Sequence, residues 1–179
     1  MFIYKLLHEI SQMLNGLQIP YMLTGSLAYN LYAIPRATRD IDMIIEIQQT
    51  DVMRFLQAIQ GKYYFYEPTI IEEIKRHGLF NIIHLESSYK IDFIVRSDDI
   101  FEIAKFKERN AIEFEGNKLY VISLENLIIS KLRWIQLLES ELHKRDIETL
   151  LKSPNVNIEY IKQWCKKLNL NTYNLIDYE

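Results

Sequence analysis

The amino-acid sequence predicts an α/β fold in which helices flank a mixed β-sheet and a helical part follows at the carboxyl-terminal end. Short apolar runs with strand alternation occur among helical-period segments up to residue 122, and only helical periodicity follows. No repeat, low-complexity tract or linker interrupts the chain. We therefore expect residues 1–179 to form one unit, with an α/β core over residues 1–122 and a helical part over residues 123–179 packed on it.

The composition is typical of a well-packed protein and argues against several classes. At 179 residues, with 49% hydrophobic and 25% charged residues, the chain can bury one core and stay soluble. A formal net charge of -3 argues against binding duplex nucleic acid mainly through a basic surface. A single cysteine (Cys165), a start unlike a signal peptide and no long apolar run predict a cytoplasmic protein without a membrane partner.

The first elements are a helix, a strand and a second helix. Apolar side chains recur at helical spacing over residues 2–17, until a glycine and a proline interrupt the pattern. An apolar strand over residues 21–24 ends at Gly25 and Ser26, and a short helix over residues 27–32 follows. The order is therefore strand, tight turn, helix.

A second strand and two more helices come next. Residues 40–47 alternate acidic or mixed positions with apolar ones, which indicates a strand. A helix over residues 52–59 begins after a Thr-Asp cap, and a further helix follows Pro68 and ends near Gly78.

Two hairpins and a run of helices complete the pattern. Strands over residues 80–86 and 89–96 flank a Ser-Ser turn, and strands over residues 111–114 and 118–122 flank a Gly-Asn turn. The remaining signal is helical, over residues 124–138, 143–152 and 158–168.

Asp40 and Asp42 are placed two residues apart in a strand, so their side chains project from the same face. Like charges this close repel, and the pair is costly unless a cation lies between them. Mg²⁺ prefers oxygen ligands and commonly binds one or two carboxylates together with substrate phosphates. The pair favours a metal site, although Asp-x-Asp is also common on solvated strand faces.

Asp92 is an acidic residue within an otherwise apolar strand, on the same face as Lys90 and Ile94. If this strand lies beside the strand of Asp40 and Asp42, three carboxylates meet. Such a group suits two metal ions about 3.5–4 Å apart, which activate a nucleophile and stabilise the leaving oxygens. Asp92 is then the candidate general base.

Gly25 and Ser26 stand where a strand turns into a helix. A glycine at this point lets the backbone approach a phosphate closely, and the start of the helix presents free N–H groups to an anion. The pair alone often only caps a helix. Its position upstream of two aspartates strengthens the interpretation as a phosphate-binding turn.

Lys131 falls in the middle of the apolar stripe of the helix expected over residues 124–138. A buried ammonium without a partner is expensive, so Lys131 must reach a carboxylate or a bound anion, unless its long stem extends to solvent. Asp146 borders the apolar face of the next helix. A contact between Lys131 and Asp146 is therefore expected.

These motifs together resemble a known superfamily. Gly25-Ser26, thirteen residues, Asp40-Ile41-Asp42 and a later Asp92 in an apolar strand resemble the signature of polymerase-beta-type nucleotidyltransferases. The resemblance implies the nucleotidyltransferase fold, in which the Gly-Ser pair holds the triphosphate and the first two aspartates bind metal. The third aspartate completes the metal site and activates the acceptor. The resemblance thus implies Mg²⁺ or Mn²⁺ as cofactor and a nucleoside triphosphate as substrate.

A narrower resemblance comes from Thr38-Arg39 before the first aspartate and from residues 123–131 and 140–146. These stretches are similar to the small AbiEii-like nucleotidyltransferases of abortive-infection and toxin–antitoxin systems. The likeness implies that Lys131 and Asp146 belong to the active-site cleft, and Arg39 is expected to neutralise phosphate charge there unless it only forms a local salt bridge. It also implies an RNA (tRNA) or protein acceptor and an antitoxin partner.

The predicted function is therefore metal-dependent transfer of a nucleoside monophosphate from a triphosphate to an acceptor. Two alternatives stay open. The first is an inactive module of the same fold that binds a nucleotide or a partner. The second is a nuclease with the same metal chemistry, in which the Gly-Ser turn has no clear purpose.

Overall fold

The computed structural model, which describes residues 2–176, contains one mixed sheet of seven strands in the order β3-β4-β5-β2-β1-β7-β6. The strands are β1 (Tyr21–Thr24), β2 (Asp40–Ile45), β3 (Tyr63–Tyr64), β4 (Leu79–His84), β5 (Lys90–Val95), β6 (Asn110–Phe114) and β7 (Asn117–Val121). Strand β2 lies at the centre, antiparallel to β1 and parallel to β5. The predicted α/β class with a mixed sheet is confirmed.

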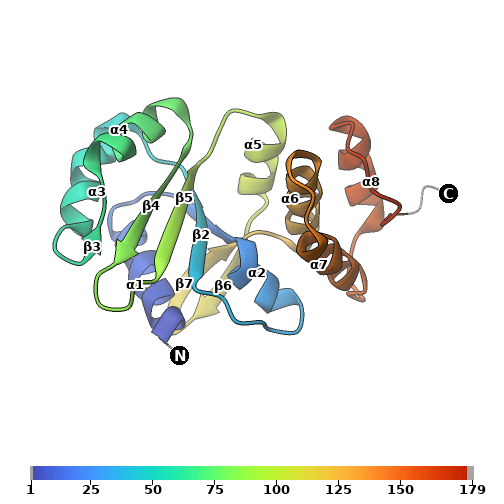
Figure 1. The fold of residues 1–179 in the computed structure, drawn as a ribbon, viewed down its shortest axis with the longest axis horizontal. Coiled ribbons are helices and arrows are strands. Elements are labelled where there is room, and N and C mark those ends of the chain that lie inside the picture. Colours follow the sequence, from blue (N-terminus) through green and yellow to red (C-terminus); the bar gives the residue numbers. More distant parts are fainter. Residues whose placement is uncertain (1, 177–179) are drawn as a thin grey trace.

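Helices surround this sheet in the described part of the chain (Figure 1). They are α1 (Phe2–Gly16), α2 (Gly25–Tyr32), η1 (Gln49–Asp51), α3 (Val52–Ile59), α4 (Glu67–Arg76), α5 (Ile100–Lys107), α6 (Leu124–Leu137), α7 (Glu141–Leu151) and α8 (Ile158–Lys167). Helices α3 and α4 lie at one end of the molecule and α6, α7 and α8 at the other (Figure 1). No helix within residues 2–176 has the length and apolar character needed to cross a membrane.

The alternation of β2 and β5 buries one face of each strand in the core. Ile41 and Met43 on β2 and Ile91 and Phe93 on β5 are fully buried. The Phe93 ring also contacts Phe55 and Phe80, with ring centroids 5.5 Å and 5.3 Å apart. Because these strands are anchored from this side, their acidic residues are held on the opposite face.

The structure differs from the sequence expectation most clearly at α5, which was not predicted. Its exposed positions include Ile100 and Ile103, whereas Lys105 is 5% exposed and forms an ion pair with Glu102. Apolar residues outside and a charged residue inside reverse the usual amphipathic pattern, so periodicity does not reveal this helix. The two-residue strand β3 was also missed, because such a short segment carries no detectable alternation.

The start of α5 gives a test of this part of the fold. The Asp99 carboxylate accepts hydrogen bonds from the backbone N–H groups of Phe101 and Glu102 at 2.9 Å and 3.1 Å. We expect Asp99→Ala to lower the free energy of unfolding by about 1–2 kcal/mol in urea titrations, because these N–H groups lose their cap. Asp98→Ala, next to it and exposed, should change that free energy by less than about 0.5 kcal/mol. Equal effects of the two variants would contradict the capping role.

Candidate active site

The central feature of the site is the pairing of β2 with β5. These strands are parallel, and their register sets Asp42 opposite Asp92 and Asp40 opposite Lys90. Strand alternation puts Asp40 and Asp42 on one face of β2. The sequence left open whether the strand of Asp92 lies beside the strand of the two other aspartates, and the structure places it there.

The Gly-Ser turn lies against this acidic group. Helix α2 starts at Gly25 directly after β1, and Thr24 is the antiparallel partner of Asp42. Gly25 has φ +64, and a Cβ atom added there would lie 1.9 Å from Asp42 Oδ2. The backbone of Ser26 donates a hydrogen bond to Asp42. A glycine is therefore required both by the backbone conformation and by the proximity of the carboxylate.

The electrostatics of Asp42 follow from this crowding. Desolvation by burial, with the nearby charges of Asp92 and Asp40, raises the pKa of the Asp42 carboxyl group from 3.8 to about 6. The Ser26 hydrogen bond and the Lys90 ammonium act in the opposite direction but do not cancel the rise. A cation placed among these carboxylates would lower this cost, as the chemistry of a metal site requires.

Lys90 provides one such positive charge. Its Nζ lies 2.8 Å from Asp92 Oδ2 and 3.9 Å from Asp40 Oδ1. The hydrogen bond to Asp92 raises the pKa of Lys90. Within residues 2–176, no group of three or more His, Cys, Asp or Glu side chains is arranged to hold a metal ion. The backbones of Asp40, Asp42 and Asp92 are thus brought together, while the Asp92 side chain is turned to the ammonium.

A second charged cluster joins α2, α6 and α7. Lys131 Nζ lies 2.8 Å from Asp146 Oδ2, and these residues are only 6% and 3% exposed. The expected Lys131–Asp146 contact is confirmed. Arg36 Nη2 reaches the same oxygen at 3.0 Å. The Arg36 backbone is fixed in turn by two hydrogen bonds with the side chain of Asn30 on α2.

Tyr29 and His143 also belong to this cluster, and neither was predicted from the sequence as a site residue. The Tyr29 ring lies 5.3 Å from the Arg36 guanidinium carbon and 5.7 Å from Lys131 Nζ. Burial, with the charge of Lys131, lowers the pKa of His143. His143 Nδ1 and Arg36 Nε are buried without a hydrogen-bond partner among the described residues. The one sequence signal for His143 was its spacing of three residues from Asp146, which puts both on one helix face.

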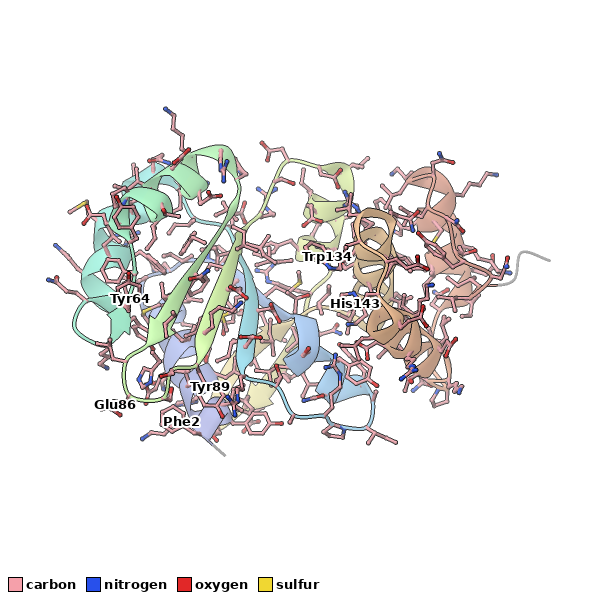
Figure 2. The ribbon with its side chains drawn as sticks, viewed as in Figure 1. Phe2, Tyr64, Glu86, Tyr89, Trp134 and His143 are labelled. Atoms are coloured by element: carbon pink, nitrogen blue, oxygen red, sulfur yellow. The ribbon has the colours of Figure 1, made fainter. Side chains whose placement is uncertain are left out.

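Arg39 lies in a different place from Lys131 and Asp146. It lines a hollow of about 280 Å³ with Ser87, Ser88 and Tyr89. Arg39 precedes β2 and Tyr89 precedes β5, so the hollow lies off the starts of the two strands that carry the carboxylates. Figure 2 shows Tyr89 beside Phe2 at this end, with His143 on the side of α7. The rings of Phe2 and Tyr89 stack with their centroids 5.9 Å apart.

Helix α2 starts at a glycine against the Asp-x-Asp strand, with a third aspartate on the parallel neighbour, which is the arrangement that the resemblance to nucleotidyltransferases implied. Solved structures of this class share the fold. The solution structure of the antibiotic-resistance factor ANT(2'')-Ia aligns with a TM-score of 0.62 and 14% identity, over 94% of this chain and 91% of that chain. The crystal structure of the lincosamide antibiotic adenylyltransferase LnuA, with lincomycin bound, aligns with a TM-score of 0.52 and 19% identity, over 83% of this chain and 96% of that chain.

A third similar structure is that of an antigenic nucleotidyltransferase-like protein from Paracoccidioides brasiliensis. It aligns with a TM-score of 0.57 and 15% identity, over 92% of this chain and 86% of that chain. Comparison with curated proteins finds no match. The model of the family described as "Nucleotidyltransferase of unknown function (DUF6036)" matches residues 3–177, and the chain belongs to this family. By its family the protein is therefore a nucleotidyltransferase.

The contact between Gly25 and Asp42 predicts how the turn tolerates a methyl group. Gly61→Ala is the matched control, since Gly61 has φ +78 and nothing within 4 Å of an added Cβ. We expect Gly61→Ala to cost about 1 kcal/mol of unfolding free energy through the left-handed backbone alone. Gly25→Ala should cost about 1–3 kcal/mol more, because its Cβ also collides with the carboxylate. Equal losses in thermal and urea unfolding would show that the collision has no effect.

The raised pKa of Asp42 predicts a pH-dependent stability. The folded state binds the proton more tightly than the unfolded chain, so ionised Asp42 destabilises the fold above pH 6, and this cost falls away as the pH drops toward 3.8. Asp42→Asn removes the charge. In metal-free buffer, its gain in unfolding free energy should be about 2 kcal/mol larger at pH about 7.5 than at pH about 4. A gain independent of pH would contradict the assigned pKa.

Proposed function

We propose that transfer by this enzyme depends on Mg²⁺ or Mn²⁺ held by Asp40, Asp42 and Asp92. The register that sets Asp42 opposite Asp92, with Ser26 bonded to Asp42, is the observation that carries the proposal. The donor set fits, because all three groups offer carboxylate oxygens and the like charges raise the cost of leaving the site without a cation. When bound, the ion supplies neutralisation of phosphate charge and orientation of the reacting groups.

The triphosphate is proposed to lie between the Gly25–Ser26 turn and the cluster of Lys131 and Asp146. Free N–H groups at the start of α2 and the backbone approach allowed by Gly25 suit a phosphate. In the cluster, Lys131 and Arg36 share the one carboxylate of Asp146, which leaves an excess of positive charge for an anion. The buried Arg36 Nε without a partner adds a donor that a ligand can use.

Asp92 is proposed to act as general base. It accepts the proton of the acceptor hydroxyl, whose oxygen then forms a bond to the α-phosphorus. The bond from that phosphorus to the bridging oxygen breaks, and pyrophosphate leaves with the electron pair in line with the attack. Lys131 is proposed to hold the triphosphate during this step, and Asp146 keeps Lys131 in position. Arg39 is proposed as a further cation for the nucleotide or for the acceptor that enters at the hollow it lines.

For the acceptor we propose RNA, such as tRNA, or a protein, and for the physiological role the toxin of a toxin–antitoxin pair. Support comes from the AbiEii-like form of the motifs around Arg39, Lys131 and Asp146. An antitoxin is the partner that this role requires. A second candidate is an inactive module of the same fold, and the pairing of Lys90 with Asp92 favours it, because an internal cation already neutralises one carboxylate.

The metal role of Asp42 predicts the effect of Asp42→Asn on transfer. Incubation with α-labelled nucleoside triphosphates, Mg²⁺ and total RNA or protein should label an acceptor in the wild type. Loss of a metal ligand should reduce this labelling at least about 100-fold while the fold remains. Digestion of the product with ribonuclease or protease identifies the acceptor class. Asp98→Asn, an exposed carboxylate outside the site, is the control, and full labelling by Asp42→Asn would refute the assignment.

A further inference from the structure

Lys90 occupies a position that the predicted metal chemistry does not explain. It is the first residue of β5, and the parallel register sets it opposite Asp40. The next pair on the same face, two residues further along each strand, is Asp42 and Asp92. The Lys90 side chain therefore shares the face of the acidic residues. The ammonium bridges the two strands, at 2.8 Å from Asp92 Oδ2 and 3.9 Å from Asp40 Oδ1.

The two members of the closer ion pair differ in their freedom to move. The Asp92 side chain is 12% exposed, whereas the Lys90 side chain is 41% exposed. A lysine has a flexible four-carbon stem and a single compact charge. Its ammonium can therefore leave the carboxylate and be hydrated by water at a low cost in free energy. The Asp92 carboxylate, in contrast, is buried and needs a positive or donating partner wherever Lys90 goes.

We propose that Lys90 is a displaceable counter-ion, which neutralises the carboxylates in the metal-free enzyme and which a divalent cation must displace from Asp92 in order to bind. The inference rests on the proposed function, because it concerns the same metal site. It adds that Lys90 regulates how tightly this site binds the metal ion. A metal ion that displaces Lys90 breaks an ion pair and brings two like charges close together. Free metal therefore binds more weakly than three carboxylates alone would bind it.

The charge of Lys90 can be removed with little change of shape. Lys90→Met keeps the apolar stem and loses the ammonium, and Lys90→Arg keeps the charge. Lys62→Met is the matched control, since Lys62 is an exposed lysine in the turn before β3. Titration with Mn²⁺, followed by electron paramagnetic resonance of the free ion, measures affinity without any need for turnover.

We expect Lys90→Met to bind Mn²⁺ at least about tenfold more tightly than the wild type, because the competing charge is gone. Lys62→Met and Lys90→Arg should stay within about threefold of the wild type, a shift well below that of Lys90→Met. Saturating Mn²⁺ should also raise the melting temperature of Lys90→Met more than that of the wild type. If Lys90→Met does not fold without metal, Lys90→Gln purified with Mn²⁺ and then dialysed provides the same comparison.

Equal or weaker Mn²⁺ binding by Lys90→Met overturns the proposal. An absence of binding by both proteins also overturns it, because removal of the ammonium would then uncover no metal site. Failure of the proposed function is separate from this result. Tight binding by Lys90→Met without nucleotide transfer by the wild type supports the counter-ion and rejects the metal-dependent activity. Transfer by the wild type with unchanged affinity in Lys90→Met rejects the counter-ion alone.

Discussion

Repulsion among three carboxylates on two adjacent strands is the constraint around which this structure is arranged. Parallel pairing of β2 and β5 forces Asp42 and Asp92 to face each other, and strand alternation adds Asp40 to the same face. The core on the opposite face fixes both backbones, so the strands cannot separate to relieve the repulsion. Relief comes from positive or donating groups instead, namely the Ser26 N–H and the Lys90 ammonium.

Helix α2 connects this acidic group to the basic cluster. Its first turn touches Asp42, while Tyr29 on the same helix contacts Arg36 and Lys131. One short helix therefore fixes the distance between a site of negative charge and a site of excess positive charge. A metal–triphosphate complex carries both signs of charge, and this pattern is complementary to it.

Local patterns revealed most of the fold and part of the site. Alternation located both acidic strands, and the apolar stripe of α6 identified Lys131 as buried, but the side-chain partner of a strand residue depends on register, which a sequence does not display. The approach of Lys90 to Asp40 was invisible for that reason. Alternation did place Lys90 and Asp92 on one face of the same strand, but it does not show which way the flexible lysine side chain turns. Helix α5 was missed because its buried Lys105 and exposed isoleucines oppose the usual pattern. The place of Arg36 depends on contacts between segments 110 residues apart.

The order of these groups along the chain has a consequence for synthesis. The turn at Gly25 comes first, the third carboxylate follows at Asp92, and Asp146 comes last. Because a polypeptide leaves the ribosome amino end first, the acidic residues of β2 and β5 are made before Asp146 is available to pair with Lys131 and Arg36. Lys131 and Arg36 therefore lack the carboxylate that they share until helix α7 has been synthesised.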